Sequence, residues 1–230
     1  IRREKYLYSP INQISSLLLT PGISFMIYID EIIKDFLKTI THLETYYSSS
    51  EENNEGELKL FYWLNKQSTN KNICIYGSDS DLVLLSLKSK LLNIYIRYTS
   101  KYIFISIRKL IKSLSIHISI KFGLKNHPIR KDFMLLAMLM GNDYLPSISS
   151  FNKLWENYKK LQKQGINFLI NKNDTINFYN LKKLFKLLPD IDNNKYTKNQ
   201  VAHYLKSLDW NLKLYSGIVY PNFITSSSHI

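Results

Sequence analysis

The sequence has almost no cysteine, no long apolar run and no internal repeat. Cys74 is the one cysteine among 230 residues, so no internal disulfide can form. An intracellular, reducing compartment is therefore expected, and the sequence does not distinguish cytoplasm from nucleus. Because Cys74 lies in the apolar run ICIY, we expect a buried and inert thiol. The longest apolar runs, such as FMLLAMLM at 133–140, are too short to cross a bilayer, and no signal peptide is evident, so no membrane partner is expected. The opening IRREKYLY lacks methionine and indicates a fragment of a longer protein.

Acidic residues are scarce relative to basic ones. The chain holds 31 Lys and Arg against 18 Asp and Glu, a formal net charge of +13. This balance favours a polyanionic partner, with nucleic acid first and an acidic membrane surface second. An AT-biased coding sequence, rich in Ile, Lys, Asn and Tyr, would also produce much of the charge. The five histidines show no metal-ligand spacing, so we assign them no role.

Hydrophobic periodicity predicts an α/β protein. A mainly parallel sheet flanked by helices is expected within residues 1–150, followed by a mostly helical extension over 151–230. In the first helix one apolar face is expected to be buried. Strands are predicted over 42–48, 73–77 and 92–98, and helices from the Thr20-Pro21-Gly22 start, from Glu55, over 105–115, over 132–140 and around 197–215.

Three short acidic motifs lie at the ends of these elements. Asp79 and Asp81 follow a strand and a glycine, Glu55 and Glu57 open a helix in NNEGELK, and Asp143 follows a helix end in GNDYLP. Ligand sites of open parallel sheets form beyond the carboxyl ends of the strands. Acids gathered there would repel one another unless a cation neutralised them, and oxygen ligands alone suit Mg²⁺ or Mn²⁺. Two such ions, about 4 Å apart, can clamp the attacking and leaving oxygens of a phosphodiester.

Each motif also has a simpler interpretation. An Asp-x-Asp after a strand is commonly a turn or a helix cap, and acids at a helix start commonly complement the helix dipole. Gly-Asn-Asp before a proline is commonly a helix stop. The order and spacing of the three motifs therefore carry more information than any one of them.

In that order, the motifs resemble the 5′→3′ exoribonuclease (XRN) family, which belongs to the metal-dependent 5′ nucleases with the flap endonucleases. TPGISFM is similar to the family's TPG-x-x-FM, NNEGELK to its PGEGEHK, and CIYGSDSDLVLLSL to its CIYG-x-DADLI-x-LGL. RKDFMLLAMLMGNDYLP is similar to DDF-x-L-x-x-F-x-VGNDFLP, and YLKSLDWNLKLYSG to Y-x-x-x-L-x-W-x-L-x-YY-x-G. The acidic motifs alone would equally suit a flap nuclease. The TPG helix, DYLP and the Trp210 segment favour the exoribonuclease branch.

The resemblance implies a PIN-like fold whose first strands are missing here, and a function for the intact protein. By position it implies that Glu55, Glu57, Asp79, Asp81 and Asp143 are the catalytic, metal-binding carboxylates for two Mg²⁺ ions, with Mn²⁺ as an alternative. It further implies hydrolysis of single-stranded RNA from a 5′-monophosphate end, releasing nucleoside 5′-monophosphates. The family's remaining metal-binding acids and its 5′-phosphate pocket lie in a segment that would precede Ile1. We therefore expect this chain alone to be inactive.

The sequence departs from the family pattern at several positions. Asn53-Asn54 replace Pro-Gly, but Asn tolerates positive φ, so the turn can survive. Leu58 replaces a histidine, and the aromatic stretch after the last helix is shortened to 219–223, where Tyr220 could take over some stacking. Two alternatives stay open: a structure-specific flap-type DNA nuclease, and a degenerate, non-catalytic RNA-binding or assembly component.

Basic residues also offer candidate RNA contacts. Residues 101–131 hold eight Lys and Arg and no acid, which would suit a track for the RNA backbone or a solvated helix face. Lys59 lies one turn from the proposed site. The candidate nucleic-acid contacts are Lys59, Arg108, Lys109, Lys112 and Tyr220.

Overall fold

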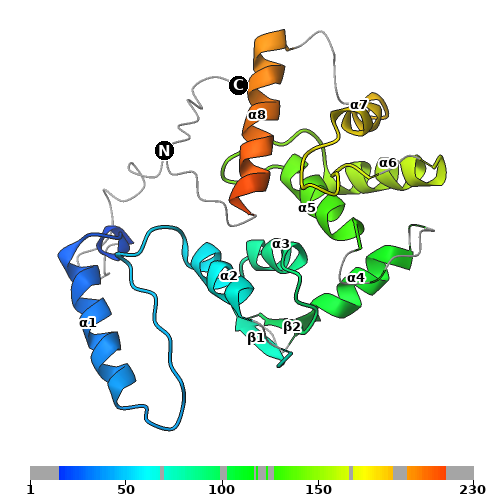
Figure 1. Cartoon of the computed structure of the whole chain (residues 1–230). Coiled ribbons are helices and arrows are strands. Elements are labelled where there is room, and N and C mark those ends of the chain that lie inside the picture. Colours follow the sequence, from blue (N-terminus) through cyan, green and yellow to red (C-terminus); the bar gives the residue numbers. More distant parts are fainter. Residues whose placement is uncertain are drawn as a thin grey trace. The chain divides into compact units, whose positions relative to one another are not determined.

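A computed structural model describes residues 16–67, 70–98, 103–116, 118, 123, 127–165, 168–188 and 196–215. The chain divides into two compact units, residues 1–59 and 60–230, which are described separately (Figure 1). The predicted division near residue 150 stays a prediction.

The first unit is built on helix α1 (Ser24–Lys38), preceded by the short 3₁₀ helix η2 (Ser16–Leu19). The prediction that Pro21 begins the helix was wrong, because Gly22 has a φ of +83° and cannot be helical. The predicted buried apolar face was also wrong: Ile32 and Phe36 are 46% and 62% exposed. Asp30 is the buried residue of α1 instead.

Asp30 organises the loop that follows α1. Its carboxylate, 2% exposed, accepts hydrogen bonds from the Ser50 backbone N (3.0 Å), the Ser50 hydroxyl (2.6 Å) and the Tyr47 hydroxyl. The Ser50 hydroxyl, followed by that of Tyr47, lowers the pKa of Asp30. Residues 42–48 form no strand, contrary to prediction, since this segment is held by a side chain of α1 rather than by a neighbouring strand. Helix α2 (Gly56–Lys66) then begins after Glu55, as predicted.

The second unit contains a three-stranded sheet in the order β1 (Ile73–Tyr76), β2 (Ile94–Arg97), β3 (Phe104–Ser106). The predicted strands at 73–77 and 92–98 are confirmed, and they pair in parallel with Ile73 opposite Ile94. Strand β3 pairs antiparallel to β2, so the described sheet is mixed rather than mainly parallel. The physical reason is the short connection from β2 to β3, because a parallel crossover needs about a dozen residues or more.

One face of this sheet forms the core of the second unit. Ile75, Ile94 and Ile96 are buried beneath α3 (Asp81–Lys88) and α4 (Ile107–Ile116), and α5 (Ile129–Leu139) packs on both helices (Figure 1). Side chains alternate between the two faces of a strand, so Cys74 points to the opposite side from Ile75. Its thiol is exposed, and the prediction of a buried cysteine was wrong.

The helical extension follows as α6 (Phe151–Lys163), α7 (Phe178–Lys186) and α8 (Lys198–Leu214). A buried carboxylate joins it to α5: Asp132, fully buried, accepts hydrogen bonds from the Tyr158 hydroxyl (2.8 Å) and from the backbone N of Leu169 and Ile170 (both 3.0 Å). Burial outweighs these donors and raises the pKa of Asp132 to about 7.

Arg130, from the start of α5, forms buried hydrogen bonds that stabilise the C-terminal end of α3. Its buried guanidinium donates to the carbonyl oxygens of Leu87 (2.8 Å) and Ser89, which are among those left unpaired at a helix C-terminus. Burial lowers the pKa of Arg130 to about 10. Among the helices in the described ranges, none has the length and apolar character needed to span a bilayer.

Candidate functional site

The first site element is the turn between β1 and α3, which carries Asp79 and Asp81. Gly77 lets this turn pack closely, because a Cβ there would lie 2.5 Å from Cδ1 of Leu82. Asp79 Oδ1 accepts a hydrogen bond from the Asp81 backbone N at 2.8 Å, which forms an Asx turn that leads into α3. This is the turn that the simpler interpretation of Asp-x-Asp expects, and the metal-binding role of Asp79 stays a prediction. The Asp81 carboxylate takes no part in this turn.

A hydrogen bond from a residue near the end of the described sequence fixes the Asp81 side chain. The Tyr215 hydroxyl donates to Asp81 Oδ2 at 2.6 Å, joining residues 134 positions apart. Tyr215 is the C-cap of α8 and is 5% exposed, so the ring is fixed by packing. A hydrogen bond to a carboxylate is stronger than one between neutral groups. This contact restricts the orientation of Asp81.

The second site element is the GNDYLP turn that ends α5. Gly141 has a φ of +100°, and a Cβ there would lie 3.0 Å from the Ser147 backbone N, so both conformation and space require glycine. Asn142 Oδ1 accepts hydrogen bonds from the backbone N of Tyr144 (3.0 Å) and Leu145 (2.9 Å). The turn is therefore rigid, and it leaves Asp143 exposed at its tip.

Helix α8 holds this second turn as well. Asn142 Nδ2 donates to Asn211 Oδ1 at 3.2 Å, and Tyr144 packs edge-on against Trp210 with ring centroids 5.4 Å apart. Asn211 and Tyr215 lie four residues apart and share a face of the helix. The partners of Asp81 and of the Asn142 turn are thus about one helical turn apart, about 6 Å along α8. The last turns of α8 bring the Asp-x-Asp and Gly-Asn-Asp motifs to one side of the second unit.

Glu55 and Glu57 lie in the first unit, at the start of α2. Asn54, which precedes them, has a φ of +84°, so the prediction that asparagine can replace glycine in this turn is confirmed. The Lys59 ammonium donates to the carbonyl oxygen of Ser49 at 2.7 Å and so supports the loop before the helix. Its predicted contact with a phosphate stays a prediction.

The carboxylates fit a hard divalent cation by their chemistry, because they supply only oxygen donors. Within the described parts of the chain, however, no three His, Cys, Asp or Glu side chains are grouped so that they could hold a metal ion. Two of the five predicted acids belong to the first unit and three to the second. Their meeting at one metal site therefore stays a prediction.

The predicted RNA contacts of the basic stretch divide into two kinds. Arg108, Lys109 and Lys112 are exposed on α4 and remain available to a ligand. Arg130, from the same stretch, is buried in its helix-capping role and cannot contact RNA. Tyr220 lies outside the described residues.

Comparison with known proteins adds two findings. The sequence model of the family described as "XRN 5'-3' exonuclease N-terminus" matches residues 3–98, a range that includes the Glu55, Glu57, Asp79 and Asp81 motifs. The chain is also 25% identical over 157 residues to "Putative 5'-3' exonuclease R528" of Acanthamoeba polyphaga mimivirus, with 58% of this chain covered. The chain is related to the XRN 5′-3′ exonucleases. The match spans 25% of the length of the viral relative, about a quarter.

The sequence drew attention to the acidic motifs but not to the residues that hold their turns in place. Tyr215 and Asn211 lie in the YLKSLDWNLKLYSG segment, whose resemblance to the family was noted without a role for either. Asn142, in GNDYLP, and Asp30 were likewise given none. A polar residue within an otherwise apolar helix face, such as the fully buried Asn211, is the one signal that could have drawn attention to this support.

Proposed function

We propose that this XRN relative is part of a 5′→3′ exoribonuclease, which hydrolyses single-stranded RNA from a 5′-monophosphate end and releases nucleoside 5′-monophosphates. The observation that carries the proposal is the joint anchoring of two acidic motifs by α8: Asp81 through Tyr215, and the Asn142–Asp143 turn through Asn211. A decayed site would have no reason to keep a 134-residue connection that orients one carboxylate.

Glu55, Glu57, Asp79, Asp81 and Asp143 would hold the metal ions, with Mg²⁺ as the expected cation. When bound, such ions supply positive charge for the oxygens of the scissile phosphodiester. The chain itself contributes orientation: Tyr215 restrains Asp81, and Asn142 fixes the backbone on which Asp143 is presented. Oriented ligands lose less freedom when a cation binds, which strengthens binding.

A substrate comparison tests this proposal. The full-length protein that contains these 230 residues is incubated with Mg²⁺ and three substrates: 5′-monophosphorylated RNA, the same RNA with a 5′-hydroxyl, and flapped DNA. We expect stepwise release of nucleoside 5′-monophosphates from the first, with a preference over the 5′-hydroxyl RNA on the order of 10²-fold. Cleavage of flapped DNA with RNA left intact would identify the flap-nuclease alternative. RNA binding without cleavage of any substrate would identify the non-catalytic alternative.

A further inference from the structure

The outer face of the β1–β2–β3 sheet is exposed and largely apolar, while α3 lies over the opposite face (Figure 1). The strand register arranges the outer side chains in two rows that cross the three strands. These rows are Cys74, Tyr95 and Ser106, and then Tyr76, Arg97 and Phe104. The rings of Tyr76, Phe104 and Tyr95 are 62%, 57% and 37% exposed, and the Cys74 thiol is exposed as well.

Arg97 lies between two of these rings. Its guanidinium carbon is 5.4 Å from the ring centroid of Tyr76, on β1, and 5.9 Å from that of Phe104, on β3. A guanidinium at such distances is attracted by the face of an aromatic ring. The second row is therefore a continuous contact across all three strands, in which the one cation is already associated with rings.

The residues of this face are those of a covered sheet rather than of a solvated one. A sheet with one face in water usually carries polar side chains on that face, whereas parallel strands in α/β proteins are covered on both faces. Here the six outer positions hold three rings and a cysteine, and Arg97 is the one charged residue among them. The parallel β1–β2 pair with an antiparallel edge strand is also a common arrangement in sheets that are covered on both faces.

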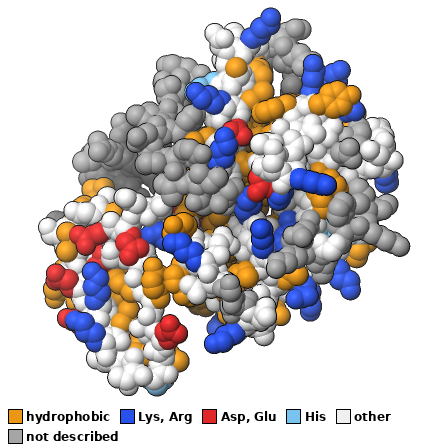
Figure 2. All heavy atoms as spheres, viewed as in Figure 1, with side chains coloured by type: hydrophobic (Ala, Val, Ile, Leu, Met, Phe, Trp, Pro, Cys, Tyr) orange, Lys and Arg blue, Asp and Glu red, His pale blue; other side chains and the backbone are white. Residues whose placement is uncertain are grey.

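The chemistry of the face favours a helix over nucleic acid as its cover. Residues 60–230 carry 25 of the 31 Lys and Arg, and Figure 2 shows these residues spread over the second unit, yet the outer sheet face holds one. Single-stranded nucleic acid needs a positively charged groove beside the rings. An α-helix with an apolar stripe needs only an apolar face, and it is the usual cover of a sheet in α/β proteins. The match to the viral relative spans 25% of that protein, so a protein built like it has further chain to supply such a helix.

We propose that the outer sheet face is an interface for an amphipathic helix of the full-length protein that lies outside these 230 residues. The apolar stripe of this helix packs on Tyr76, Tyr95 and Phe104 and covers the Cys74 thiol. The interface uses none of the five carboxylates, and it does not rest on the proposed nuclease function.

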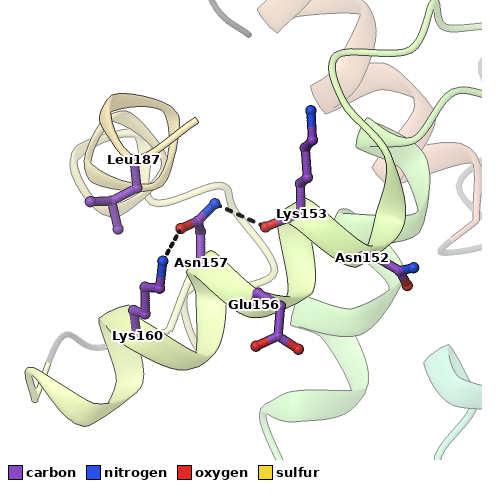
Figure 3. A pocket seen from close by; sticks show the side chains of 6 residues that line it. All are labelled: Asn152, Lys153, Glu156, Asn157, Lys160 and Leu187. Atoms are coloured by element: carbon purple, nitrogen blue, oxygen red, sulfur yellow. Dashed lines mark hydrogen bonds between the residues drawn. The ribbon is translucent and has the colours of Figure 1, made fainter. Parts of the chain in front are cut away.

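Cys74 reports directly on this interface. Its alkylation by N-ethylmaleimide in the full-length protein is followed by mass spectrometry of the peptide that contains it, in native buffer and in urea. A covered thiol should react on the order of 100-fold more slowly in native buffer, because it reacts only when the structure opens. The matched control is Cys74→Ser/Asn152→Cys. Its thiol replaces an exposed residue of α6, at the hollow of about 500 Å³ between α6 and the end of α7 (Figure 3), and should react at nearly the same rate in both buffers.

Two tyrosine variants provide a test that does not use thiol chemistry. Tyr76 and Tyr179 are 62% and 69% exposed in this structure, so replacing either by Ser should cost little stability if both rings meet water. A ring covered by a helix loses buried contacts when it is removed. Tyr76→Ser should therefore lower the Tm of the full-length protein by several degrees more than Tyr179→Ser does.

The proposal is overturned if native Cys74 reacts as fast as the Asn152→Cys control, or if the two tyrosine variants have the same Tm. Equal protection of Cys74 in the 230-residue chain alone would also overturn it, because the cover would then belong to this chain. Protection that appears only with added oligouridylate would identify a nucleic-acid surface instead, and protection that is lost when a dimer dissociates on dilution would identify a second copy. None of these measurements involves hydrolysis, so failure of the nuclease proposal would leave them readable.

Discussion

Replacing Asp81 by Asn in the full-length protein should lower RNA hydrolysis on the order of 10³-fold or more, with little change in RNA affinity. The amide is neutral and so would bind a divalent cation weakly, yet its oxygen can still accept the hydrogen bond from Tyr215. Folding and the contact with α8 should therefore persist. Single-turnover rates at saturating RNA, together with Mn²⁺ affinity from electron paramagnetic resonance, give the two readouts.

Tyr215→Phe is the matched control, because it removes the hydrogen bond that Asp81→Asn keeps and keeps the carboxylate that Asp81→Asn removes. Loss of a group that orients a metal ligand should cost about tenfold in metal affinity or rate. The expected order is therefore a small loss for Tyr215→Phe and a near-complete loss for Asp81→Asn. Near-normal turnover by Asp81→Asn, or equal losses in the two variants, would contradict a metal-binding role for Asp81.

The second large effect concerns stability. Asp132→Ala should lower the free energy of unfolding by about 3–5 kcal/mol, since a buried donor left without an acceptor costs about 1–3 kcal/mol. Three donors lose their acceptor: the Tyr158 hydroxyl and the backbone N of Leu169 and Ile170. Urea denaturation measures this change. A loss below about 1 kcal/mol would mean that water replaces the carboxylate and that the site is not closed.

The same residue predicts a pH dependence of stability. The pKa of Asp132 is about 7 in the folded protein against 3.8 for an unperturbed aspartate, so the folded state binds this proton more tightly. The free energy of unfolding should therefore fall as pH rises from about 4 to 7 and level off above that range. Asp30 and Asp174 have lowered pKa values, and their contributions are lost at lower pH, outside this window. Asp132→Asn should remove the fall, and wild-type stability that rises between pH 5 and 7 would contradict it.

Helices with a strong hydrophobic periodicity could be predicted from the sequence. Segments whose conformation depends on contacts with other parts of the fold could not. The 132–140 and 197–215 patterns gave α5 and α8 because a long apolar stripe at helical spacing has few other solutions. The Thr20-Pro21-Gly22 pattern satisfied the rules for a helix start, yet the conformation of Gly22 excludes it. Cys74 was misplaced because an all-apolar strand does not reveal which of its faces the helices cover.

The candidate site was also only partly predictable from the sequence. The acidic motifs were noticed because they occupy turns that follow one another in a recognisable order. The positive φ of Asn54 was expected because asparagine tolerates this backbone conformation better than most residues. The contact between Tyr215 and Asp81 could not be predicted, because no local pattern links residues 134 positions apart. The buried role of Arg130 was hidden for a related reason: in sequence it resembles the exposed basic residues around it, such as Arg108.

The proposed nuclease function requires that Asp81, Asp143 and Glu57 bind a divalent cation together, and manganese located by anomalous X-ray scattering in crystals of the full-length protein tests this requirement. We expect a Mn²⁺ peak about 2.0–2.2 Å from carboxylate oxygens of these three residues. Ordered carboxylates that point apart, with no manganese between them, would contradict it.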